Sequence, residues 1–136
     1  MQRKLMEGGC LCGAIRYQIE GEARRITHCH CIHCRRSSGA AFVTWIQFNP
    51  SDFKITSGVP CQYESRPRVT RQFCGKCGSQ LTYQDAEEPH KIDVTACSLD
   101  NVGAISPDDH VWCDRMVPWL KISDELPRYK LGKDDE

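Results

Sequence analysis

The sequence predicts a mainly β protein that binds zinc. Short runs of β-branched and aromatic residues follow one another along the chain, separated by turns that contain glycine and proline, and no long amphipathic helix interrupts them. Seven of the ten cysteines fall into three tight groups, and thiols spaced one or two residues apart can converge on a single zinc ion. We therefore expect many short strands around metal, with at most short helices.

The clearest strand lies in residues 14–20, where isoleucine and tyrosine alternate with polar side chains. This period of two is typical of a half-buried strand, and Gly21 ends it. Gly8 and Gly9 precede the first pair of cysteines. Gly13 follows the pair, so we expect the two cysteines to lie in a flexible turn, because on a straight strand two thiols at this spacing would face opposite ways.

The middle of the chain is expected to hold one short helix and a series of short strands. Residues 32–38 favour one or two helical turns ended by Gly39, since glycine readily adopts the left-handed conformation that ends a helix. Residues 25–27 lead into the central cysteines. The remaining β-rich runs predict strands at 41–48, 53–56, 61–64, 69–73, 79–84, 90–96 and 110–112.

Length and composition fit one soluble domain over residues 1–136, with 40% hydrophobic and 26% charged residues. No apolar run is long enough to cross a bilayer, so membrane insertion is not expected. Residues 1–8 are positively charged without a following apolar stretch, which predicts no secretory signal and a cytoplasmic location. The formal net charge of zero gives no general attraction to nucleic acid.

An even number of cysteines would also fit a disulfide framework. The spacing argues against it, because Cys-x-Cys and Cys-x-x-Cys pairs are poorly shaped for bridges to each other. A reducing cytosol also keeps thiols free for metal.

Two of the cysteine groups suit one structural zinc site. Pairing Cys74 and Cys77 with Cys10 and Cys12 gives four thiolates, which close a tetrahedron around zinc. The alternatives are a redox-active Cys-x-x-Cys pair and cysteines without a ligand. No strand-helix context of the thioredoxin kind surrounds Cys74, which disfavours the redox alternative.

The central group, Cys29, Cys31 and Cys34, then lacks a fourth cysteine. Three protein ligands leave one zinc position open, where a water or an external thiol can bind and lose its proton near neutral pH. His30 or His33 could instead be the fourth ligand and close the site. A zinc ribbon, in which the first two cysteine groups share one metal, is another geometry that the sequence allows.

These groups occur together with several further motifs in a fixed order. The motifs are Gly9-Cys10-Leu11-Cys12-Gly13, Cys29-His30-Cys31-Ile32-His33-Cys34-Arg35, Gly39-Ala40-Ala41-Phe42, Phe73-Cys74-Gly75-Lys76-Cys77-Gly78, His110-Val111-Trp112, Pro118-Trp119 and Leu126-Pro127-Arg128-Tyr129. Over nearly its whole length the chain resembles the glutathione-dependent formaldehyde-activating enzymes, a family also called GFA or centromere-protein-V-like.

The resemblance implies a fold of stacked small antiparallel sheets around a zinc site, similar to methionine sulfoxide reductase B and to a small zinc protein that binds Rab GTPases. It implies two zinc ions: a structural one on Cys10, Cys12, Cys74 and Cys77, and a second, substrate-proximal one on Cys29, Cys31 and Cys34. It also implies a carbon-sulfur lyase activity, the reversible condensation of glutathione with formaldehyde to S-hydroxymethylglutathione.

Glutathione carries two carboxylates, which need cations near the second zinc. Arg35 and Arg36 directly follow Cys34 and are the candidates we name, although Arg24, Arg25, Arg66, Arg68 and Arg71 are equally available. Asp100 and His110 are possible proton carriers, and a structural role for His110 is the alternative.

Cys61, Cys97 and Cys113 lie outside the metal groups, and packing is their expected role, with a redox role for Cys113 as the alternative. A second hypothesis for the whole chain is a non-enzymatic, zinc-scaffolded module that binds a protein partner. For the enzyme we expect a small thiol such as glutathione as partner, no nucleic acid and no membrane, and a monomer or homodimer.

Overall fold

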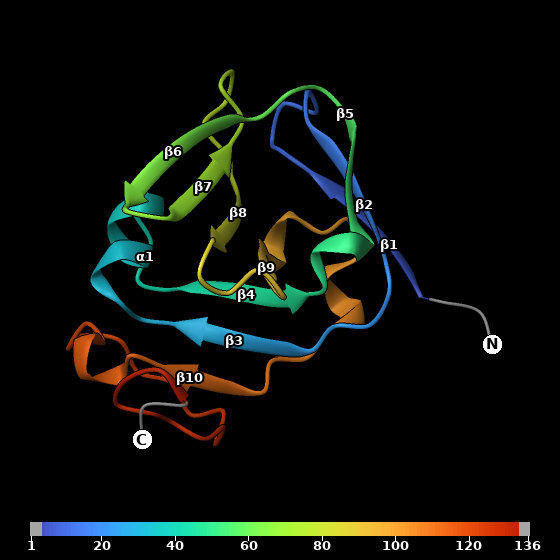
Figure 1. The fold of residues 1–136 in the computed structure, drawn as a ribbon. Helices are drawn as coiled ribbons and strands as arrows, with labels where there is room; N and C mark the ends of the chain where they lie inside the picture. Colours follow the sequence, from blue (N-terminus) through green and yellow to red (C-terminus); the bar gives the residue numbers. More distant parts are fainter. Residues whose placement is uncertain (1–3, 134–136) are drawn as a thin grey trace.

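A computed structural model describes residues 4–133, and it confirms the prediction of a mainly β fold (Figure 1). The first of two sheets has three antiparallel strands in the order β1-β2-β5. Its strands are β1 (Leu5–Gly9), β2 (Arg16–Glu20) and β5 (Phe53–Ser57).

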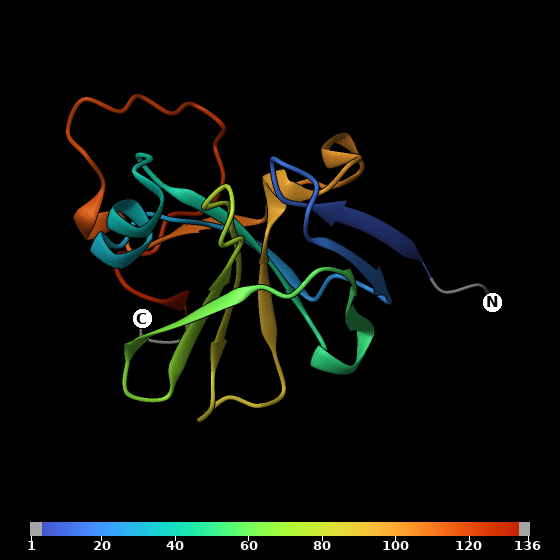
Figure 2. The same cartoon turned by 90° about the horizontal axis from the view of Figure 1, so that it is seen from above.

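The second sheet has seven strands in the order β10-β3-β4-β9-β8-β7-β6. Its strands are β3 (Arg25–Cys29), β4 (Val43–Phe48), β6 (Cys61–Arg66), β7 (Val69–Phe73), β8 (Gln80–Asp85), β9 (Ile92–Thr95) and β10 (Asp109–Val111). All neighbours are antiparallel except β10 and β3, which run parallel. Figures 1 and 2 show that β6, β7 and β8 turn steeply away from the direction of β3 and β4, so the sheet is strongly bent.

Helical structure is confined to short segments. They are α1 (Ile32–Ser38) and the 3₁₀ turns η1 (Pro50–Asp52), η2 (Ala96–Ser98), η3 (Val102–Ala104) and η4 (Cys113–Arg115). Within residues 4–133, no helix is long and apolar enough to cross a membrane.

The buried apolar side chains of residues 4–133 form two clusters. The larger one joins the two sheets through buried side chains that include Tyr17, Ile19, Ile46, Phe48 and Leu81. The smaller one lies at the other end of the large sheet and consists of Cys29, Cys34, Val43, Trp45 and Val111. The central cysteines are therefore part of a packed core, which fixes their positions.

The predicted helix is confirmed with its bounds. Gly39 follows α1 with a left-handed φ of 70° and donates its N–H to the Arg35 carbonyl at 2.7 Å. The strands predicted from residue 41 onward are observed with ends that differ by one or two residues, as strand ends depend on the pairing partner.

The first pair of cysteines lies in a turn, as predicted, and Gly13 has a left-handed φ of 82° there. Gly8 and Gly9, which precede the pair, form the end of β1, and Gly8 pairs with Tyr17 of β2. A side chain at Gly8 would collide with the Tyr17 hydroxyl group and the Ser98 carbonyl. Glycine is thus needed for close approach rather than for a turn, which the sequence pattern alone does not distinguish.

Candidate functional site

The first and third cysteine groups meet, although 62 residues separate Cys12 from Cys74. Cys10 and Cys12 lie in the turn between β1 and β2, whereas Cys74 and Cys77 lie in the turn between β7 and β8. All four sulfur atoms lie within 4.8 Å of one another. The sulfur of Cys12 is 3.7 Å from that of Cys10 and 3.8 Å from that of Cys74.

These separations match a tetrahedral zinc site. With a zinc–sulfur bond of about 2.3 Å, two thiolates at the corners of a tetrahedron are about 3.8 Å apart. Backbone N–H groups also point at the sulfurs, from Ile15 to Cys10 at 3.2 Å and from Lys76 to Cys74 at 3.4 Å. The Ser79 hydroxyl, 3.1 Å away, lowers the pKa of Cys77 to about 5, which favours the thiolate that zinc requires.

The central group also converges. Cys29 ends β3, Cys31 is the N-cap of α1, and Cys34 lies in the first turn of that helix. Their three sulfurs lie within 4.8 Å of one another. The Cys34 N–H donates to the Cys31 sulfur at 3.3 Å, and the Trp45 indole N–H donates to the Cys34 sulfur at 3.3 Å. Contacts with the Cys29 and Cys34 thiols lower the pKa of Cys31, so the group favours at least one thiolate.

Neither adjacent histidine joins the three thiols within this distance in the described chain. His30 is fully buried among rings, and its Nε2 lies 2.9 Å from Nδ1 of His110, whose Nε2 lies 2.7 Å from the Asp124 carboxylate. His28, His110 and Asp124 form a third group of possible metal ligands. The central group thus offers three sulfur ligands, and His110 belongs to a buried network rather than to the cavity beside the thiols.

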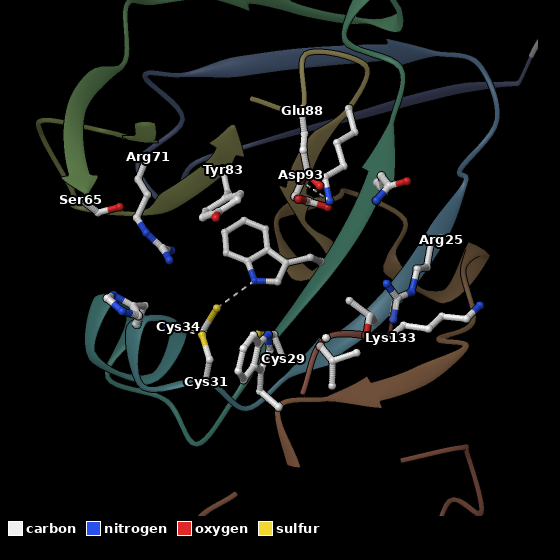
Figure 3. A pocket seen from close by; sticks show the side chains of 18 of the residues that line it. Arg25, Cys29, Cys31, Cys34, Ser65, Arg71, Tyr83, Glu88, Asp93 and Lys133 are labelled. Carbon is white, nitrogen blue, oxygen red and sulfur yellow. Dashed lines mark hydrogen bonds and ion pairs between the residues drawn. The ribbon is translucent and has the colours of Figure 1, made fainter. Parts of the chain in front are cut away.

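A cavity of about 570 Å³ opens onto the three central cysteines (Figure 3). Its aromatic lining comes from Trp45, Tyr83 and Trp112. Arg25 and Thr27 line it together with Cys29, because alternate residues of β3 face the same side of the sheet. This volume is in the range of small-molecule sites.

One row of side chains crosses the sheet along this cavity. Backbone pairing places it in the order Arg25 (β3), Gln47 (β4), Asp93 (β9), Tyr83 (β8) and Arg71 (β7), and all five line the cavity. The row therefore carries a cation at each end and a carboxylate near its middle.

Arg71 is the most deeply placed cation of the row. It is 7% exposed, and its guanidinium carbon lies 5.0 Å from the ring centre of Tyr83 and 6.0 Å from that of Trp45. Its Nη1 donates to the Ser37 hydroxyl at 3.3 Å. Within residues 4–133, no carboxylate lies within ion-pair distance of Arg71, and its charge helps to lower the pKa of Cys31.

The two arginines named from the sequence lie elsewhere. Arg35 and Arg36 are on α1, and neither lines the cavity. Their role in binding glutathione stays a prediction, while the arginines that do line the cavity are Arg25, Arg66, Arg71 and Arg115. Asp100 pairs with Arg16 at 2.5 Å and also lies outside the cavity.

The three remaining cysteines are not part of any metal-ligand group among the described residues. Cys61 and Cys97 are exposed and Cys113 is half-buried, so packing explains them less well than expected. Sequence reasoning left Arg71 unranked and did not consider Asp93. Only the pairing of β7, β8 and β9, which the sequence does not reveal, brings these two residues to the same cavity.

The fold and the site define a mainly β protein with two cysteine groups that could hold metal, one of them facing a cavity. The chain belongs to the glutathione-dependent formaldehyde-activating enzyme family, which it matches over residues 5–115. This confirms the resemblance read from the motifs.

Individual relatives agree with this assignment. A Halomonas elongata protein provisionally named a glutathione-dependent formaldehyde-activating enzyme is 25% identical over 97% of this chain and 90% of its own length. A Schizosaccharomyces pombe protein described as an uncharacterized lyase is 29% identical over 64% of each chain. The crystal structure of a Rhodobacter sphaeroides protein shares the fold, with a TM-score of 0.62 and 23% identity, over 90% of this chain and 99% of that one.

Proposed function

We propose that the protein is a zinc-dependent carbon-sulfur lyase of the GFA type. It would join the thiol of glutathione, or of a related small thiol, to formaldehyde or a related small carbonyl, and would also catalyse the reverse reaction. The observation that carries the proposal is the group of three cysteines without a fourth protein ligand at the wall of a cavity large enough for a substrate.

Two zinc ions would bind per chain. Cys10, Cys12, Cys74 and Cys77 would hold a structural ion that joins the two turns, and Cys29, Cys31 and Cys34 would hold the second. When bound there, zinc supplies an open ligand position at which a substrate thiol loses its proton near neutral pH.

The protein's own residues would then direct the addition. The substrate sulfur forms a bond to the carbonyl carbon, the π electron pair of the carbonyl moves to oxygen, and that oxygen takes up a proton to become a hydroxyl group. Arg71 carries a buried guanidinium in the same cavity, and residues 4–133 supply it with no carboxylate partner. Its N–H groups could donate to the carbonyl oxygen as negative charge develops, which is the most effective place for such donors.

Exchange NMR on glutathione and formaldehyde with zinc-loaded protein tests this function. Because the adduct also forms unaided, exchange must exceed that of protein-free samples. Cys31→Ser is the decisive variant, since serine is itself a preferred N-cap and preserves the start of α1 while removing a zinc ligand. Cys97→Ser, which replaces an exposed cysteine outside the metal groups, is the matched control.

The proposal expects acceleration in the wild type and in Cys97→Ser, and its loss in Cys31→Ser. Absence of acceleration with zinc confirmed in both sites would contradict it and would favour the non-enzymatic, protein-binding module. We further propose a cytoplasmic monomer or homodimer that does not bind nucleic acid, given the balanced charge of the chain.

A further inference from the structure

Asp93 is a carboxylate that faces the cavity without a partner. It lies on β9 between Gln47 of β4 and Tyr83 of β8, and it contributes to the lining (Figure 3). Within residues 4–133, no hydrogen bond or ion pair engages its side chain. The side chain is half-buried, and burial raises the pKa of Asp93 to about 6, which the attraction of Lys91 and Arg25 offsets only in part.

The cations nearest to Asp93 are already engaged. Lys91 forms an ion pair with Glu88 at 2.9 Å, and Arg25 forms one with Asp109 at 3.2 Å. Lys91 and Arg25 both attract the charge of Asp93, but their ion pairs are with these other carboxylates. A carboxylate in this setting is costly for the protein unless a cation from outside binds to it.

The position of Asp93 also fixes which part of a substrate could reach it. It is two strands away from β3, and its row crosses β3 at Arg25, four residues before Cys29. Strands about 4.8 Å apart, with a rise of about 3.3 Å per residue, place the Cα atoms of Asp93 and Cys29 about 16 Å apart. A very small thiol bound at the cysteines cannot span this distance, whereas a thiol carried on a short peptide extends toward it.

We infer that Asp93 binds the ammonium group of a thiol substrate, so that the cavity selects thiol peptides with a free amino group. The inference rests on the proposed function, because it assumes that the thiol end of the ligand lies at the central cysteines. Arg71, two strands from Asp93 in the same row, is the donor proposed above for the carbonyl oxygen, so the two residues would contact different groups of the reactants.

A comparison of two thiols tests the inference. Glutathione carries a free ammonium group, and N-acetylglutathione keeps its thiol and both carboxylates but lacks that charge. Binding would be measured by titration calorimetry and exchange with formaldehyde by NMR, for wild type, Asp93→Asn and Glu22→Gln. Glu22 is the control because it is an exposed carboxylate outside the cavity, and its replacement leaves the ion pair of Lys91 with Glu88 intact.

Wild type and Glu22→Gln should prefer glutathione by about tenfold or more, and Asp93→Asn should lose this preference by weakening glutathione alone. Equal weakening of both thiols, or an unchanged preference in Asp93→Asn, would overturn the inference while leaving the proposed function intact. If the wild type neither binds nor accelerates exchange of either thiol, the proposed function fails, and the inference fails with it.

Discussion

Replacing Asp93 by asparagine should make the folded protein more stable at neutral pH. The carboxylate has its pKa raised from 3.8 to about 6, mainly by burial, so the folded state binds its proton more tightly than the unfolded state does. At about 1.4 kcal/mol per pKa unit, ionisation of Asp93 at pH 7 costs the folded state up to about 3 kcal/mol. The amide of asparagine avoids this charge but still needs hydrogen bonds, so we expect a gain of about 1–3 kcal/mol.

The pH dependence provides the internal control. Because the pKa of Asp93 is raised in the folded state, ionisation of Asp93 does not destabilise the protein well below pH 4. The destabilisation develops as the pH rises from about 4 to about 6, and it is complete above that range. Urea unfolding of wild type and Asp93→Asn at pH 4 and pH 7, with zinc bound, would measure the difference in free energy of unfolding. The reasoning is refuted if Asp93→Asn is no more stable than wild type at pH 7, or if its advantage is as large at pH 4.

Two further predictions concern the metal groups and Arg71. Cys74→Ser should unfold the chain or sharply lower its melting temperature, because structural zinc binding is coupled to folding. Cys31→Ser should shift the melting temperature by about 5 °C or less. Equal loss of structure in the two variants, measured by circular dichroism, would contradict the division into a structural and a substrate-binding zinc. Arg71→Gln should slow the exchange of glutathione with formaldehyde by about 100-fold. Arg68→Gln is the control, because it alters an exposed arginine paired with Glu87, and it should leave the exchange rate unchanged. Similar exchange rates in both variants would exclude Arg71 from the reaction.

The cysteine groups could be predicted from the sequence because their chemistry is local. Thiols spaced one or two residues apart can come together in a turn, and the sulfurs of Cys29, Cys31 and Cys34 lie within 4.8 Å of one another through the end of a strand and the first turn of a helix. The count of four ligands favoured pairing Cys10 and Cys12 with Cys74 and Cys77, but the sequence also allowed the first two cysteine groups to share one metal. The fold places Cys10 and Cys12 beside Cys74 and Cys77.

The remainder of the site depends on strand pairing, which leaves little trace in the sequence. In β3, Arg25 and Thr27 alternate with Ile26 and His28, but a polar face that lines a cavity resembles one that faces water. For the same reason, the sequence did not show that Asp93 on β9 lines the cavity. Arg35 and Arg36 were named because they follow Cys34 in the sequence. Arg71 lies 37 residues beyond Cys34, and the pairing of β7 with β8 places it at the cavity beside the thiols.

The central claim is that the group of three cysteines holds a metal with one position open to a thiol. Cobalt-substituted protein titrated with glutathione tests this most directly, because the intensity of thiolate-to-cobalt charge-transfer bands increases with the number of bound thiolates. In wild type loaded with two cobalt ions per chain, glutathione should increase the intensity of these bands. We expect Cys31→Ser to keep only the ion at the four cysteines, so its bands should not change with glutathione. A fully loaded wild-type protein whose bands do not respond to glutathione would contradict the account.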